Sequence, residues 1–147
     1  MPPLNGNEEN EFKVQDRVQM LMKGILNPQL NSLLSRVRHT NLLVIADRGF
    51  PFWPQVETVD LALTDDIPTV LDVLRALQPN FQYGRVWMAS EFREHNSTAL
   101  AVFEAALQHR RVEYELHAVF KLRVPTAIGL IRTADTLPYA NVILESE

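Results

Sequence analysis

The stretch Leu42-Leu43-Val44-Ile45-Ala46 decides the fold class, because it is an apolar run with no polar interruption. A run of this length is typical of a β-strand, and a strand without polar alternation is one that is covered on both faces, as in parallel α/β sheets. The loop that follows, residues 47–54, is punctuated by proline and glycine. We therefore expect a covered sheet with this loop at the carboxyl end of one strand.

Helical and strand patterns alternate on both sides of this run. A helix is predicted before it, with Asn27 as cap, Pro28 at the first position and an end near Arg38-His39. After it we predict strands over 59–63, 85–89, 113–116, 127–131 and 141–144, and helices over about 68–77, 97–108 and 117–123. Asp66 or Thr64 is the expected cap of the 68–77 helix. This order predicts a single three-layer α/β/α domain with a mostly parallel central sheet.

Composition narrows the class of protein. Of the 147 residues, 46% are hydrophobic and 22% charged, which is ordinary for a globular domain. The absence of cysteine excludes disulfides and thiolate metal sites. A net charge of −4 without a basic block argues against nucleic acid, and no apolar run approaches the length of a membrane span. The start of the chain is polar and acidic, unlike a signal peptide. We expect a cytoplasmic protein, with a polar N-terminal extension over 1–19 and one functional domain over 20–147.

Residues suited to proton transfer and to hydroxyl recognition gather at a few positions. Ligands of open α/β sheets bind beyond the carboxyl ends of strands, and Asp47 follows such an end. His39 precedes the same strand and His117 opens a helix; an imidazole both gives and takes protons near neutral pH. Tyr139 and Asn141 are two apart at the lip of the last strand, so we expect them to point the same way. Their neutral donors and acceptors suit a polyhydroxylated ligand better than a phosphate, a metal or a nucleic acid.

Each of these residues also has a purely structural interpretation. His39 could be favoured by the dipole of the preceding helix, Asp47 could make only a turn, and His117 could do no more than open a helix. Tyr139 could pack its ring locally. The sequence has no glycine-rich phosphate loop, no H-E-x-x-H motif and no nucleophile elbow, so we expect neither a cofactor nor a metal.

Several short segments, taken in their order along the chain, are more specific than any single residue. In that order the chain from Lys23-Gly24 onward resembles the D-ribose pyranase and L-fucose mutarotase family (RbsD/FucU). The matching segments are Met22-Lys23-Gly24-Ile25-Leu26-Asn27, Arg38-His39-Thr40-Asn41, Ala46-Asp47-Arg48-Gly49-Phe50-Pro51, Val59-Asp60-Leu61-Ala62-Leu63-Thr64, Ile67-Pro68, His117-Ala118-Val119-Phe120-Lys121 and Pro138-Tyr139-Ala140-Asn141-Val142.

The resemblance implies a cofactor-free enzyme that interconverts the cyclic forms of a free monosaccharide. It also implies a pentameric or decameric ring of subunits, with active sites near the subunit boundaries. By position, His39 resembles the catalytic histidine. The positions that resemble substrate-binding residues are Asp47, His117, Tyr139, Ala140 and Asn141, with Ala140 contributing only its backbone.

The branch of the family decides which sugar is expected. The Asp-x-Gly-x-Pro loop from Asp47 and the Tyr-Ala-Asn segment from Tyr139 resemble the ribose branch, whereas Phe50 leans towards the fucose branch. Arg48 departs from both, since a small residue is usual there. D-ribose is the default substrate. The alternatives are L-fucose or another sugar, including an acidic one if Arg48 faces the pocket, and a non-catalytic sugar-binding ring that supports sugar uptake.

Overall fold

A computed structural model describes residues 23–147, and the predicted N-terminal extension lies outside the described residues. Six strands form one sheet: β1 (Leu42–Ala46), β2 (Thr58–Asp60), β3 (Tyr83–Ala89), β4 (Val112–Glu115), β5 (Gly129–Arg132) and β6 (Val142–Ser146). The helices are α2 (Pro28–Arg36), α3 (Val70–Leu77), α4 (Ser90–His95), α5 (Ser97–Ala106) and α6 (His117–Arg123), and the short 3-10 helix η1 (Val124–Thr126) follows α6.

The sheet is mostly parallel, as predicted. Its strand order is β2-β5-β1-β6-β3-β4. The pairs β2/β5, β5/β1 and β3/β4 are parallel, and β6 runs antiparallel to both of its neighbours. The reversed β6 therefore places its amino end beside the carboxyl end of β1, where Ile45 pairs with Val142.

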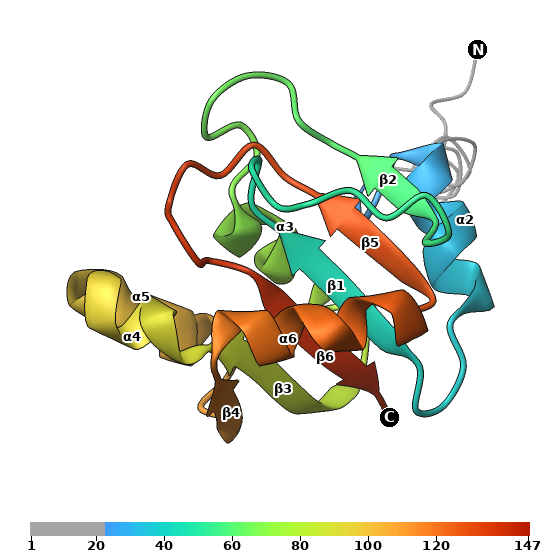
Figure 1. Ribbon diagram of the computed structural model, residues 1–147. Helices are drawn as coiled ribbons and strands as arrows, with labels where there is room; N and C mark the ends of the chain where they lie inside the picture. Colours follow the sequence, from blue (N-terminus) through green and yellow to red (C-terminus); the bar gives the residue numbers. More distant parts are fainter. Residues whose placement is uncertain (1–22) are drawn as a thin grey trace, which may run out of the picture.

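Helices cover both faces of the sheet, which confirms the three-layer architecture (Figure 1). Alternate residues of β1 enter two different cores. Leu43 and Ile45 pack with apolar residues of α2, α3 and α5. Val44 and Ala46 pack on the opposite face, with Phe120 of α6. The uninterrupted apolar run that identified this strand is thus explained by burial on both sides.

The start of α3 differs from the prediction. Neither Asp66 nor Thr64 caps it; the cap is Thr69, whose Oγ1 accepts the Asp72 N–H at 3.1 Å while the Asp72 carboxylate accepts the Thr69 N–H at 2.9 Å. This reciprocal capping box satisfies two backbone donors at once, which a cap at Asp66 could not do. The Asp66 side chain instead accepts a hydrogen bond from the Thr136 backbone N–H.

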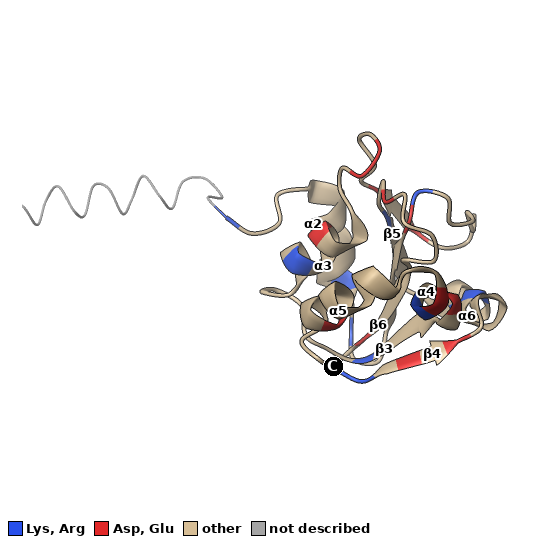
Figure 2. Ribbon diagram, turned by 90° about the vertical axis from the view of Figure 1, so that its left-hand side faces the viewer, with Lys and Arg blue, Asp and Glu red and all other residues tan. Residues whose placement is uncertain are grey.

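Two further elements differ from the sequence-based expectation. The strand predicted over 59–63 ends at Asp60, because the Asp60 carboxylate accepts the Ala62 N–H at 2.9 Å and turns the chain away from the sheet. Helix α4 was not predicted; it follows β3 directly, without a side-chain cap at its start. No helix in residues 23–147 is long and apolar enough to cross a membrane, and charges of both signs are spread over the domain (Figure 2).

Candidate functional site

A small cavity lies where β1 ends and β6 begins. Three segments meet there: the loop after β1, the first residue of α6 and the loop that leads into β6. The cavity has a volume of about 260 Å³, just below the range of about 300–1,000 Å³ that is typical of sites for drug-sized ligands. Its lining residues are Asp47, Gly49, Phe50, Pro51, His117, Pro138, Tyr139 and Asn141.

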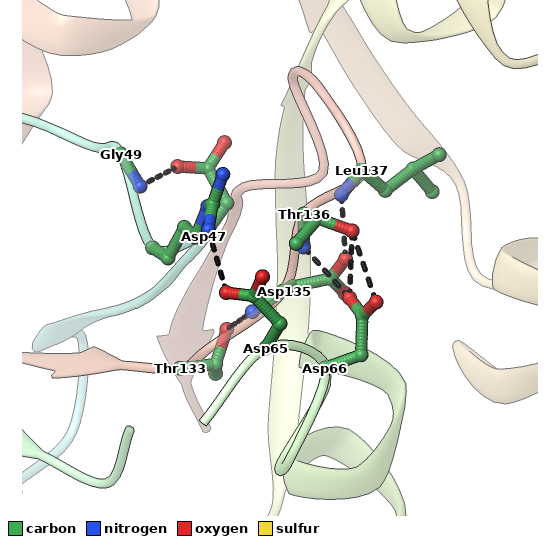
Figure 3. Close-up of polar contacts among 9 residues, drawn as sticks. Asp47, Gly49, Asp65, Asp66, Thr133, Asp135, Thr136 and Leu137 are labelled. Atoms are coloured by element: carbon green, nitrogen blue, oxygen red, sulfur yellow. Dashed lines mark hydrogen bonds and ion pairs between the residues drawn. The ribbon is translucent and has the colours of Figure 1, made fainter. Parts of the chain in front are cut away.

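Asp47 and Asn141 form a reciprocal pair at the base of this cavity. The Asn141 Oδ1 accepts the Asp47 backbone N–H at 2.7 Å, and the Asn141 Nδ2 donates to Asp47 Oδ2 at 3.3 Å. The other carboxylate oxygen accepts the Gly49 N–H at 3.0 Å, which is the turn that sequence alone allowed (Figure 3). Burial raises the pKa of Asp47, against the lowering effect of the Asn141 and Gly49 hydrogen bonds. Asp47 is therefore both a turn residue and a partly desolvated carboxylate that faces the cavity.

Arg132 holds the loop that carries Asp47, and sequence reasoning missed it. Its Nη1 donates to the Phe50 carbonyl at 2.7 Å and to the carbonyls of Asp47 and Arg48 at 3.3 Å. Its Nη2 donates to the Pro51 carbonyl at 3.2 Å. One guanidinium therefore donates to four carbonyls of this loop. The feature of the sequence that could have identified Arg132 is its position at the carboxyl end of β5, the parallel neighbour of β1.

The His117 imidazole packs among aromatic rings at the side of the cavity. It meets Tyr139 edge-to-face at 5.2 Å and Phe50 at 5.9 Å between ring centroids, and it stacks on Phe120 with an interplanar angle of 15°. Its Nδ1 is buried and has no hydrogen-bond partner among the described residues.

The charge state of His117 follows from the same surroundings. Burial lowers its pKa, and the nearby Lys121 lowers it further, whereas the carboxylates of Glu91 and Asp47 raise it. The net effect is a lowered pKa. Since the ordinary value is already near 6.5, the imidazole is neutral at neutral pH. A neutral imidazole donates through one nitrogen and accepts through the other.

Tyr139 reaches the cavity by a route that strand alternation did not foresee. β6 begins only at Val142, and Tyr139 has a left-handed backbone with φ of 60°. This conformation costs a residue other than glycine about 1–2 kcal/mol, so the loop must be held from outside. Asn96, buried at the end of α4, donates to the Pro138 carbonyl at 2.7 Å. Tyr139 and Asn141 do line one cavity, as predicted. The predicted reason, alternation along a strand, was wrong, because both residues precede β6.

Other predicted residues lie around the cavity or away from it. Ala140 is fully buried between Tyr139 and Asn141, and its side chain does not line the cavity. His95, an exposed residue at the end of α4, packs edge-to-face against the Tyr139 ring, with 5.3 Å between the ring centroids. Arg48 pairs with Asp65 at 2.5 Å, and 56% of its side chain is exposed. Arg48 does not line the cavity, so it is not a pocket residue of this chain.

His39 lies apart from these groups. It is exposed in the turn before β1, while Asp47 follows the other end of the same strand. A strand rises about 3.3 Å per residue, so the five residues of β1 separate the two positions by roughly 17 Å. His39 therefore cannot enter the cavity of its own chain.

The acidic residues beside the cavity serve the fold. Asp66 accepts hydrogen bonds from the N–H and the hydroxyl of Thr136 at 2.9 and 2.8 Å, and the buried Asp135 accepts one from the Leu137 N–H at 2.8 Å (Figure 3). Asp135 also accepts the Val70 N–H at 2.9 Å. These bonds join the loop after β5 to the start of α3. Within residues 23–147, no three His, Asp or Glu side chains are grouped to hold a metal ion.

The cavity of this three-layer α/β domain gathers a carboxylate, an imidazole, a phenol and an amide, which are groups that can exchange hydrogen bonds with a small hydroxylated ligand. The model of the RbsD / FucU transport protein family matches residues 20–147. The chain belongs to this family, as its ordered motifs suggested.

Individual relatives agree with this assignment. A D-ribose pyranase of Laribacter hongkongensis is 38% identical over 127 residues, which cover 86% of this chain and 97% of the relative. The structure of Bacillus subtilis RbsD complexed with D-ribose is 34% identical with a TM-score of 0.80, over 86% of this chain and 97% of that one. The fucose mutarotase of Streptococcus pneumoniae in complex with L-fucose is 15% identical with a TM-score of 0.69, over 82% and 91% of the two chains, and supports the fold alone.

Proposed function

We propose that this protein is an isomerase that interconverts the cyclic forms of a free monosaccharide, with D-ribose as the first substrate to test. The observation that carries the proposal is the convergence of Asp47, His117, Tyr139 and Asn141 on one small cavity. It is supported by D-ribose pyranase relatives that match along nearly their whole length. The proposed reaction uses no cofactor.

The chemistry asks for proton transfer and hydroxyl binding. Opening a sugar ring requires a proton on the ring oxygen and removal of a proton from the anomeric hydroxyl, and closing the ring reverses both steps. A positioned general acid or base typically contributes about 10²–10⁴-fold in rate. In the proposed site Asp47 accepts a hydrogen bond from one hydroxyl of the sugar. Tyr139 and the neutral His117 form hydrogen bonds with other hydroxyls of the sugar. Asn141 already uses its Oδ1 and one Nδ2 hydrogen on Asp47, which leaves one hydrogen for the ligand.

His39 remains the proposed catalytic residue, and its place requires a second copy of the chain. Because His39 cannot reach the cavity of its own chain, an adjacent subunit must supply it. The assembly that we propose is a pentameric or decameric ring of subunits. Three large apolar side chains are exposed at the start of α6 and along it: Leu116 by 63%, Val119 by 43% and Leu122 by 75%. Exposed apolar side chains that lie together mark protein–protein contacts. Light scattering should give several times the 16.8 kDa of one chain; a monomer at micromolar concentration would refute the assembly.

The deciding experiment is magnetisation-transfer NMR of exchange between the cyclic forms of D-ribose, with and without the purified protein. L-Fucose and a uronic acid are run in parallel. We expect accelerated pyranose–furanose exchange of ribose. Faster exchange of L-fucose would reassign the protein as a mutarotase for that sugar. Saturable binding of ribose without any acceleration would support the non-catalytic sugar-binding ring instead.

A further inference from the structure

We propose that Glu91 is a positioning residue of this site: its carboxylate holds the start of α6, and with it the His117 imidazole, in place against Asp47 and Tyr139. The inference rests on the proposed function for its catalytic meaning. It concerns a residue outside the cavity, contributed by the helix that sequence analysis did not predict.

The hydrogen bonds show how Glu91 acts on His117. Both Glu91 carboxylate oxygens accept the His117 backbone N–H, at 3.0 and 3.1 Å. Leu116, the residue before α6, provides no side-chain hydrogen bond to the helix. A helix start leaves backbone N–H groups without partners, so a carboxylate from α4 substitutes for the missing local cap. Ser90 in turn donates to Glu91 Oε1 at 3.2 Å, which orients the carboxylate.

The charge of Glu91 suits this place. Burial acts to raise its pKa, but the hydrogen bonds from the His117 N–H, its own backbone N–H and Ser90, together with the nearby His117 ring, leave the pKa below its ordinary value. Glu91 is therefore ionised at neutral pH. A negative charge at a helix N-terminus is favourable, because the helix dipole is positive there. Glu91 combines an anchor for the α6 backbone with a charge close to the His117 ring.

Few charged or titratable groups face His117 from the elements around it. Lys121 acts from its own helix, Asp47 from the loop after β1, Tyr139 from the loop before β6 and Glu91 from α4. Glu91 is the one among them that also bonds the His117 backbone. Its loss should therefore shift both the position and the protonation of the imidazole.

Two substitutions separate the anchor from the charge. Glu91→Ala removes both, and we expect kcat/KM for ribose exchange to fall by at least about tenfold, corresponding to about 1.4 kcal/mol. Glu91→Gln keeps an oxygen that accepts the His117 N–H, and it should recover most of the rate that Glu91→Ala loses. Since the Glu91 charge raises the His117 pKa, both variants should lower that pKa. Glu94 is exposed on the same helix, so Glu94→Ala and Glu94→Gln are matched controls.

The experiment uses the full-length assembled protein with ¹³C-labelled histidine. Ribose exchange and the NMR titration of His117, assigned with His117→Gln, are measured for all four variants. A lower rate in Glu91→Ala, recovery in Glu91→Gln and a lower His117 pKa in both support the proposal. Equal behaviour of Glu91→Ala and Glu94→Ala in both measurements overturns it. If Glu91→Ala fails to assemble, the His117 pKa of Glu91→Gln decides. If the wild type exchanges no sugar, the proposed function fails, while the titration still tests whether Glu91 controls His117.

Discussion

Replacing Asp47 by asparagine tests whether its carboxylate serves the ligand or only the fold. Asp47 accepts two hydrogen bonds through its side chain, from Gly49 N–H and from Asn141 Nδ2. An asparagine has one side-chain oxygen, so it can keep only one of these acceptor roles. Asn141 cannot simply flip to compensate, because its Oδ1 already accepts the Asp47 backbone N–H at 2.7 Å. The substitution therefore removes one hydrogen bond and places two donors against each other.

The size of both effects follows from these contacts. One lost hydrogen bond costs about 0.5–1.5 kcal/mol of folding free energy, and removal of a partly desolvated charge offsets part of it. We expect the melting temperature of Asp47→Asn to fall by no more than a few degrees. A hydrogen bond from a sugar hydroxyl to an ionised group is worth about 1.5–3 kcal/mol. Its loss should lower kcat/KM by roughly 10- to 150-fold.

The assay is ribose exchange by NMR, read beside thermal unfolding of the same samples. Asp65→Asn is the matched control, because Asp65 lies in an exposed loop, pairs with Arg48 and does not line the cavity. It should retain the wild-type rate. Wild-type exchange in Asp47→Asn would return Asp47 to the turn-forming role alone. A loss of activity that merely tracks unfolding would refute the argument in the same way.

Three other predictions follow from the same site. His39→Gln should lower exchange by about 10²-fold or more without changing the melting curve; full activity would leave His39 as a surface residue. Arg48→Ala should keep rate and sugar preference within about threefold, because Arg48 is exposed and does not line the cavity; a tenfold change in preference would place Arg48 in a pocket between subunits. The NMR pKa of His117 should lie below 6.5, and stability should decrease as pH falls from 6.5 towards that value, because the unfolded chain binds the proton more readily; a raised pKa would contradict the burial of Nδ1.

The sequence predicted the layers well because they depend on local patterns. The apolar run of β1 and the capped start of α2 at Asn27 both carry their signal within a few residues. The elements that were misplaced depend on contacts. The end of β2 is decided by the Asp60 side chain turning back onto Ala62, and an apolar pattern does not record that bond.

Four of the predicted site residues line the cavity, but the geometry that brings them together could not be predicted. Asp47, His117, Tyr139 and Asn141 do meet, yet the groups that hold them come from distant segments. Arg132 acts from β5, Glu91 acts from α4, and Asn96 acts from the end of α4. None of these belongs to a motif, because each acts through backbone groups of residues that are far away in sequence. Only the folded arrangement of the strands and helices brings these three residues close to the loops that they hold.

The separation of His39 from the cavity links the chemistry to the assembly. Within one chain the cavity holds an acceptor, a phenol and a neutral imidazole, but the proposed catalytic histidine lies at the opposite end of β1. If His39 acts, each site requires two subunits, and activity must disappear when the ring dissociates. Mixing His39→Gln subunits with Asp47→Asn subunits should then give a higher exchange rate than either variant alone, since some boundaries would pair an intact His39 with an intact Asp47. A mixture no more active than its two components, with subunit exchange shown by mass spectrometry, would refute the shared site.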